Sequence, residues 1–123
     1  MRQSLLLSAV LLLVVSCSRP APQLDQFDPK VWKDDFKGCK GNRVEYLEAV
    51  RTQRDKLKGL SERDLVGLLG KPDRNDLSEH HEKFYRYFIE PAPECKGDSA
   101  TVVLEVRFNA TGVSKEVTII AID

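Results

Sequence analysis

The sequence lacks an apolar segment long enough to cross a membrane, because its longest such run, Leu5 to Val15, has only eleven residues. A helix that spans a bilayer needs about 20 apolar residues. Arg2 precedes the run and the small residue Ser16 follows it, which is the order of an export signal. We therefore expect residues 1–16 to be a signal peptide that lies outside the fold.

Histidine is scarce, since His80 and His81 are the two in the chain. Most hydrolytic nucleophiles need a positioned base, and two adjacent histidines do not readily bind one metal ion. The tract Glu79-His80-His81-Glu82 is therefore interpreted as a solvated connector, and no spacing among the 19 acidic residues marks a carboxylate pair. We expect no catalytic residue, metal, cofactor or small-molecule substrate, and we keep an enzyme or metal protein as the third hypothesis.

An excess of either charge is also missing, because 19 Lys and Arg residues balance 19 Asp and Glu residues. A nucleic-acid-binding protein needs a basic surface, so that class of partner is set aside. The chain shows no internal repeat or low-complexity tract, and its 123 residues suit a single domain.

The three cysteines have separate expected roles. The ending Val14-Val15-Ser16-Cys17 resembles the lipobox of bacterial lipoproteins, which implies that Cys17 becomes an acylated N-terminus. Acyl chains such as palmitate would anchor the protein, because each buried methylene contributes about 0.8 kcal/mol. Ser18, where an Asp would favour the inner membrane, points to the outer membrane, on either its periplasmic or its outer side. The alternative is a plain secretory signal, with Cys17 a stray thiol.

Acylation of Cys17 would leave Cys39 and Cys95 as a pair in an exported and therefore oxidising setting. We expect a disulfide between them, which would stabilise the fold by about 4 kcal/mol on the chain-entropy model. Two free thiols in the core are the alternative.

Helical signals fill the first half of the mature chain. Residues 17–26 contain two prolines and are expected to be a lipidated tether, followed by one domain over residues 27–123. Asp28-Pro29 predicts the start of a short helix with Trp32 and Phe36 on one face. Asn42 with Glu45 forms a capping-box pattern that predicts a longer helix to about Gly59. The apolar line of that helix is Val44, Leu47, Val50 and Leu57. Ser61 predicts the cap of a further helix, which stops at Gly70.

Strand signals fill the second half. Residues 83–90 are rich in aromatic and β-branched residues, residues 101–109 alternate apolar with polar side chains, and residues 113–122 return after a turn at Asn109–Gly112. Helices followed by strands indicate an α+β fold, with two to three N-terminal helices packed on one face of a three-stranded antiparallel sheet.

The first strand supplies a candidate partner surface. Alternation sends Phe84, Arg86 and Phe88 to one face of the sheet and Tyr85, Tyr87 and Ile89 to the other. One set would be a protein or lipid contact if it faces outward, and both are ordinary core if the helices or the tether cover them.

Several of these segments together resemble the SmpA/OmlA (BamE-like) lipoproteins. KGLSERDLVGLLGKPDR is similar to the family's Ser/Thr-capped helix and LG-x-P-D segment, FYRYF to its aromatic strand, and LEVRFNATGVSKEV to its final hairpin. With the lipobox, the resemblance covers roughly residues 57–119. It implies a non-catalytic accessory subunit in β-barrel protein assembly at the outer membrane. The Cys39 region, the helix from Asn42 and Cys95 depart from the pattern, so no binding residues are carried over.

The leading hypothesis is a lipid-anchored envelope protein that binds another envelope protein. The runner-up resembles β-lactamase-inhibitor modules, which use a similar helix-and-sheet unit to block an enzyme. A broad apolar patch on the uncovered face of the sheet would favour the runner-up.

Overall fold

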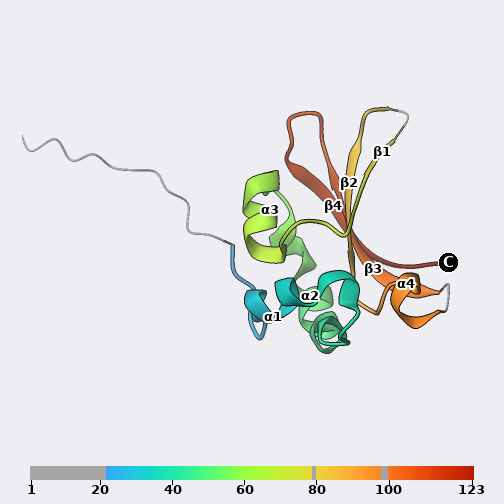
Figure 1. Cartoon of the computed structure of the whole chain (residues 1–123). Coiled ribbons are helices and arrows are strands. Elements are labelled where there is room, and N and C mark those ends of the chain that lie inside the picture. The colour runs from blue at the N-terminus through green and yellow to red at the C-terminus, as the bar shows by residue number, and fades with distance from the viewer. Residues whose placement is uncertain (1–21, 79, 98–99) are drawn as a thin grey trace, which may run out of the picture.

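The computed structural model describes residues 22–78, 80–97 and 100–123, so the predicted signal peptide and Cys17 lie outside the described residues (Figure 1). The fold is α+β with an antiparallel sheet, as predicted, but these described residues form four strands and four α-helices. The elements in chain order are α1 (Pro29–Asp34), η1 (Phe36–Gly38), η2 (Arg43–Tyr46), α2 (Leu47–Gln53), η3 (Arg54–Leu57), α3 (Glu62–Leu69), β1 (Arg74–Leu77), β2 (Lys83–Phe88), α4 (Pro93–Lys96), β3 (Thr101–Phe108) and β4 (Ser114–Ile122), where η marks a 3-10 helix.

The sheet is a meander in the order β1-β2-β3-β4, so each strand pairs with its neighbour in sequence. The predicted strands correspond to β2, β3 and β4, and β1 is additional. Its sequence RNDL carries no apolar alternation and little β-propensity. It is a strand because it pairs with β2, from Arg74 opposite Arg86 to Leu77 opposite Lys83.

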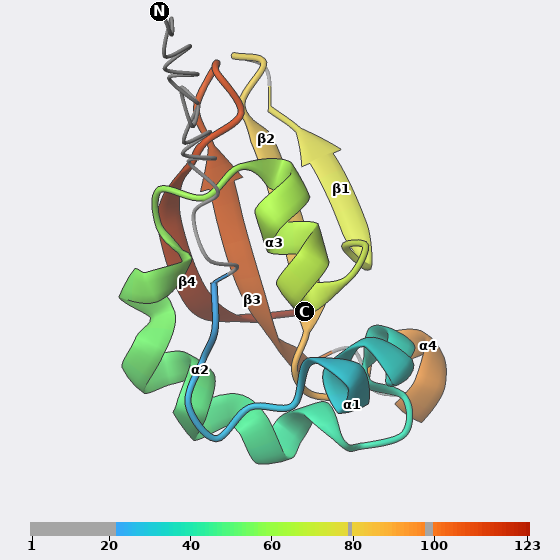
Figure 2. The same cartoon turned by 90° about the vertical axis from the view of Figure 1, so that its left-hand side faces the viewer.

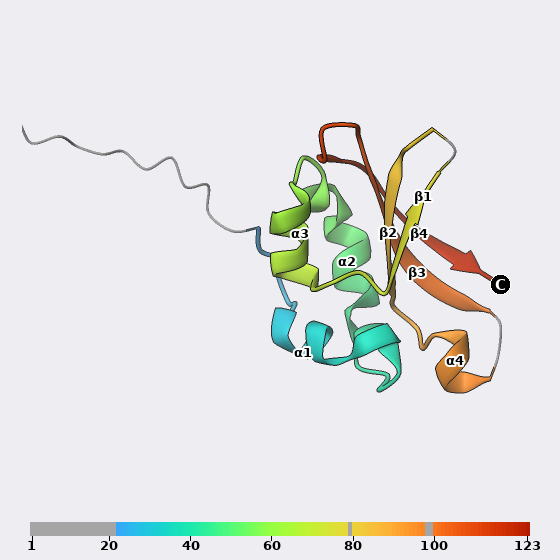
Figure 3. The ribbon, with the colours of Figure 1, turned by 45° about the horizontal axis from the view of Figure 1, so that its top comes forward.

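Helices α1, α2 and α3 cover one face of the sheet, and α4 lies on the far side at one end of it (Figure 3). The main core fills the space between the three helices and the sheet, where removal of apolar side chains from water stabilises the fold. Its fully buried members include Trp32, Val50, Leu57, Leu65, Leu69, Tyr87, Leu104, Val106 and Phe108. Trp32 is therefore a core residue.

The predicted tether is too long at its C-terminal end. Leu24 is buried in the main core, and the backbone of Asp25 exchanges two hydrogen bonds with the side chain of Gln53. Residues 24–26 therefore belong to the domain, because one apolar residue among polar ones was enough to dock this segment on α2.

Helix α1 begins as predicted, with the Asp28 carboxylate accepting from the Lys30 amide and Pro29 in the first turn. It ends at Asp34, so the expectation that Phe36 shares a face with Trp32 is wrong. Phe36 is 56% exposed. The ring of Trp32 instead contacts Phe27, with ring centroids 5.4 Å apart, and lies under the guanidinium of Arg43.

The predicted long helix after Asn42 is broken into η2, α2 and η3. Asn42 caps no helix, since its side chain makes no capping hydrogen bond and its φ and ψ are helical. The amides of Asn42 and Arg43 donate to the carboxylate of Asp35 instead. The predicted apolar line is also wrong at Val44, which is exposed while its neighbour Arg43 is buried.

Helix α3 forms as its sequence predicts. The Ser61 hydroxyl accepts from the amide of Asp64, and Leu65, Leu68 and Leu69 are buried. The helix ends at Gly70, which has a positive φ of 82° that a residue with a Cβ rarely adopts.

Candidate functional site

The face of the sheet turned away from α1, α2 and α3 is the candidate interaction surface, and we call it the open face. Paired residues of neighbouring strands share a face, so the register assigns its members. They are Arg74, Asp76, Phe84, Arg86, Phe88, Thr101, Val103, Glu105, Arg107, Glu116, Thr118, Ile120 and Ile122. Phe84, Arg86 and Phe88 therefore lie on one face, as alternation predicts, and Tyr85 and Tyr87 are covered by the helices.

Phe88 is not available to a partner, so its inclusion in the candidate surface is wrong. Its side chain is fully buried with Ala92 and Val103, and Ile120 and Ile122 pack against that cluster. The guanidinium of Arg74 also lies over the Phe88 ring, 5.0 Å from its centroid. The cause is the segment into α4, which folds back over this end of the open face.

Arg86 and Phe84 remain accessible in part, since both are half-buried. Arg86 Nε donates to Glu105 at 2.8 Å, and Arg86 Nη1 donates to Asp76 at 3.0 Å. Arg107 likewise pairs with Glu116 at 3.2 Å. Ion pairs therefore cross β1, β2, β3 and β4 in the middle of the open face, and this described surface is not the broad apolar patch that an inhibitor-like module would use.

A second polar group lies at the rim of the helix-covered face. The carboxylate of Glu62, at the start of α3, accepts from Lys83 Nζ at 2.8 Å and from the Tyr85 hydroxyl at 2.7 Å. The hydrogen bond from Lys83 is the main cause that lowers the pKa of Glu62, and the bond from Tyr85 adds to it. Burial and then the Glu62 carboxylate raise the pKa of Tyr85 to about 12. This group joins α3 to the sheet.

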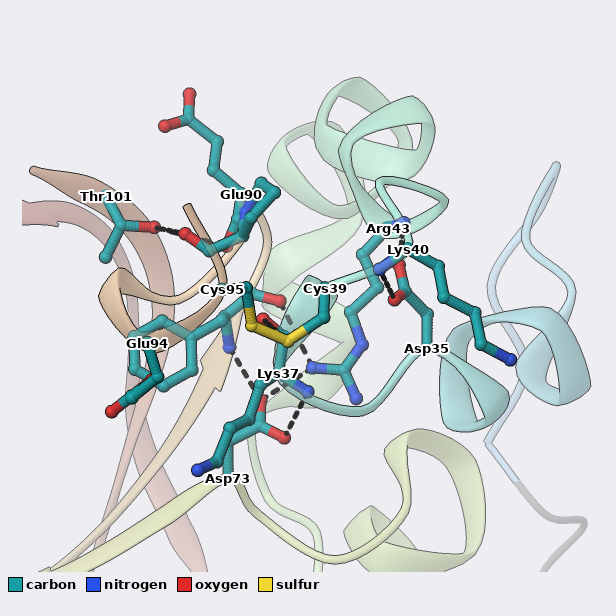
Figure 4. The surroundings of a disulfide bond; sticks show 12 residues. Asp35, Lys37, Cys39, Lys40, Arg43, Asp73, Glu90, Glu94, Cys95 and Thr101 are labelled. Carbon is teal, nitrogen blue, oxygen red and sulfur yellow. Dashed lines mark hydrogen bonds and ion pairs between the residues drawn. A yellow bond between two sulfur atoms is a disulfide. The ribbon is translucent and has the colours of Figure 1, made fainter. Parts of the chain in front are cut away.

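The predicted disulfide between Cys39 and Cys95 is confirmed, and it lies at the end of the domain where η1 and α4 meet (Figure 4). It joins positions 56 residues apart, with a Cα–Cα distance of 5.5 Å. The same two segments are held by a hydrogen bond from the Ala92 amide to the Lys37 carbonyl at 2.9 Å. The disulfide therefore fastens α4 and the cover of Phe88 to the helical half.

Behind the disulfide lies a buried ionic cluster that the sequence did not reveal. Arg43 Nη1 contacts Asp73 Oδ2 at 2.6 Å, and their side chains are 1% and 0% exposed. Arg43 also donates to the Trp32 and Phe88 carbonyls. Asp73 accepts the amides of Lys37 and Phe88. A local pattern would not identify these residues, because charged residues are usually exposed.

Asp35 completes this cluster. Its carboxylate accepts the amides of Lys40, Asn42 and Arg43, at 2.7, 2.8 and 3.0 Å. Such bonds replace the water lost on burial, which makes a fully buried carboxylate tolerable. The cluster joins α1, η2, the segment before β1 and the end of β2, so its role in the described geometry is to fix these segments.

The histidines do not form a site with the surrounding described residues. His80 and His81 are both exposed in the connector between β1 and β2. Across residues 22–78, 80–97 and 100–123, no three His, Cys, Asp or Glu side chains are grouped to hold a metal ion. Within the same ranges, no helix has the length and apolar character needed to cross a bilayer.

Comparison with known proteins gives no relative from which to assign a family. No family model matches the chain, and neither a curated protein nor a solved structure is significantly similar to it. The sequence signals and the geometry of the described residues are therefore the basis of the proposed function.

Proposed function

We propose that this chain is a lipid-anchored envelope lipoprotein that acts as a non-catalytic accessory subunit by binding another envelope protein. The observation that carries the proposal is the Cys39–Cys95 disulfide, which pairs two of the three cysteines. Cys17, in the lipobox-like tract, is the one that remains for acylation. A disulfide between exposed cysteines also fits an oxidising compartment such as the periplasm.

The length of the chain before the fold supports a position close to the membrane. Among the described residues, Leu24 is the first that is buried in the core, and it lies seven residues after Cys17. Seven extended residues span at most about 25 Å, so an acylated Cys17 would hold the domain against the bilayer surface. A partner of the domain would then be a membrane protein or another protein at the same surface.

The partner surface in this proposal is the accessible part of the open face around Phe84 and Arg86. It combines a half-buried aromatic ring with arginines, and both are enriched at protein interfaces. The resemblance to BamE-like lipoproteins makes the β-barrel assembly machinery the specific partner that we propose, at the outer membrane.

Metabolic labelling with palmitate in a Gram-negative host tests the anchor. We expect the unmodified chain to incorporate the label and to fractionate with membranes, and Cys17→Ala to do neither. Cys39→Ser with Cys95→Ser is the matched control and should be labelled like the unmodified chain. Labelling that survives Cys17→Ala would overturn the anchor.

Site-specific photo-cross-linking in intact cells tests the partner. A photoreactive residue in place of Phe84 should give an adduct with a second envelope protein, identified by mass spectrometry. The control replaces Glu48, which is exposed on α2 away from the open face, and should give no such adduct. Recovery of only uncross-linked chain from the Phe84 position would count against this surface.

A further inference from the structure

The two edges of the sheet differ in how well they are protected against pairing with another strand. Strand β1 has four residues, which include Arg74 and Asp76, and short charged edge strands resist edge-to-edge pairing. Strand β4 has nine residues and runs along the opposite edge, on the left of the sheet in Figure 2. From Val117 to Ile122 it contains no charged residue and no proline.

The start of β4 is covered by the chain itself. The Ser114 amide donates to the Leu60 carbonyl, the Gly59 amide donates to the Ser114 carbonyl, and Ser61 forms a bridge with Val113. In the described part of the chain, no segment other than β3 pairs with Val117–Ile122. This stretch of the edge is therefore open.

The hydrogen-bond pattern fixes which residues present their backbone groups outward. The Ile89 amide donates to the Val102 carbonyl, so the backbone groups of Val102 point toward β2. Because these directions alternate along an antiparallel strand, the backbone N–H and C=O groups of Val103 and Glu105 point toward β4. The backbone groups of their partners on β4, Ile120 and Thr118, point back toward β3. Val117, Ile119 and Ala121 consequently turn their N–H and C=O groups to the open edge.

We infer that the β4 edge binds a second copy of this chain, with the two β4 strands antiparallel and related by a two-fold axis at Ile119. This register pairs Ile119 with Ile119 of the second copy, and Val117 with its Ala121. All of these residues are outward-facing, so the pairing satisfies the open backbone groups on both strands.

Two charges that flank the open stretch select this register: Lys115, which lies at the bulge of β4 and pairs with no β3 residue, and Asp123, which follows the end of the strand at Ile122. It places Lys115 opposite Asp123 of the second copy, and the symmetry creates this pair twice. Shifting one strand by two residues in one direction places Lys115 opposite Ala121 of the second copy. A shift by two residues in the other direction places Asp123 opposite Val117 of the second copy. Opposite charges directly across a sheet stabilise the pairing, and a charge facing an apolar residue does not.

The side chains beside the new junction are suited to it. Val117 is buried and Ile119 is half-buried on the helix-covered face, so pairing would extend the core across the two copies. The edge of one strand buries less surface than a standard protein interface, so the isolated domain would dimerise weakly. The inference does not depend on the lipid anchor, although anchoring would raise the effective concentration of the strands.

Amide hydrogen exchange of the purified full chain tests the pairing at two protein concentrations, about 10 μM and about 1 mM, which bracket the affinity expected for a small interface. The Val117, Ile119 and Ala121 amides should exchange at least about tenfold more slowly at the higher concentration. The Thr118 and Ile120 amides bond to β3 and should show the same protection at both. Equal exchange of the outward amides at both concentrations would overturn the inference.

Charge reversal tests the register. Lys115→Asp and Asp123→Lys should each raise the dimer dissociation constant about tenfold in sedimentation equilibrium, and the double variant should restore it. Both side chains are exposed, so the fold should tolerate the changes. Lys30→Asp on α1 is the control and should leave dimerisation unchanged. A chain that remains monomeric at every concentration would show that this edge does not bind a second copy.

Discussion

Arg43 and Asp73 lie 30 residues apart in the sequence and form an ion pair of 2.6 Å with both side chains almost completely buried. The guanidinium also stacks on Trp32, with 4.8 Å to the ring centroid. A buried ion pair often contributes little net stability, but removal of one partner leaves an uncompensated charge in the interior. The pair therefore makes the fold depend on both residues.

Asp73→Asn should be among the most destabilising polar substitutions in the domain. The amide keeps the shape of the carboxylate but leaves the Arg43 guanidinium without its counter-charge, so we expect the free energy of unfolding to fall by about 3–5 kcal/mol. Urea denaturation followed by tryptophan fluorescence measures this, because the single Trp32 lies beside Arg43. Glu48→Gln removes the exposed Glu48–Arg51 pair and should cost less than about 1 kcal/mol. Equal effects of the two variants would contradict a structural role for the buried pair.

Signals that depend on neighbouring residues could be predicted from the sequence. The caps at Asp28 and Ser61 are confirmed, because each bonds an amide within three residues. The β3–β4 hairpin is also confirmed, since alternation and the turn at Asn109–Gly112 are local. The failure at Asn42 has the opposite cause: Asp35, seven residues earlier, takes over its amide.

In the candidate partner surface, too, the features set by neighbouring residues were predictable and those set by distant segments were not. Alternation along β2 correctly groups Phe84, Arg86 and Phe88 on one face, because it follows from strand geometry alone. The burial of Phe88 could not be predicted, since it depends on Ala92 and Val103 from separate segments. The pairing of Cys39 with Cys95 was predictable because the expected acylation of Cys17 left these two cysteines as a pair.

Loss of the disulfide should destabilise the domain strongly. On the chain-entropy model, replacing Cys39 and Cys95 with serine lowers the free energy of unfolding by about 4 kcal/mol. The segment into α4 should loosen first, because the disulfide fastens it to η1, and Phe88 would then become accessible. Denaturation with and without reductant measures the effect. Reductant should destabilise the unmodified chain to the level of the double variant and should leave that variant unchanged, and an unmodified chain insensitive to reductant would contradict the expectation.

Gly38→Ala should be more costly than Gly59→Ala, although both glycines have positive φ, 65° and 77°. A Cβ at Gly38 would lie 3.0 Å from the Glu90 carbonyl oxygen, whereas a Cβ at Gly59 would meet nothing within 4 Å. We expect about 1–2 kcal/mol for Gly59→Ala from the backbone conformation, and about 2–4 kcal/mol for Gly38→Ala, where the contact adds to it. Thermal unfolding compares the two, and similar losses would show that the Glu90 backbone moves aside.

Glu62 should make the domain sensitive to acid. Its pKa is lowered by Lys83 and Tyr85, so its stabilising contribution is present above the ordinary value of 4.5 and is lost as the pH falls through the lowered pKa. Glu62→Gln should therefore be less stable than the unmodified chain at neutral pH and should lose less stability below pH 4.5. Urea denaturation over a pH series measures both. Asp64→Asn, on the same helix and exposed, is a control for the removal of one carboxylate, and parallel pH profiles for Glu62→Gln and the unmodified chain would contradict the prediction.

Tyr85 should set part of the alkaline limit of stability. Burial disfavours its phenolate and the bond to Glu62 favours its neutral form, so its pKa rises from 10.0 to about 12. The stability from the neutral hydroxyl is complete below pH 10 and is lost as the pH rises through 12. The Tyr85→Phe variant should lose less stability over this interval. It should still lose some, because burial also raises the pKa of Tyr87. Phenolate absorbance locates the titration, and Glu62→Gln should move the Tyr85 transition to lower pH because a neutral amide replaces the carboxylate. If Tyr85→Phe and the unmodified chain lost the same stability between pH 10 and 12, the Tyr85 hydroxyl would not be the group responsible.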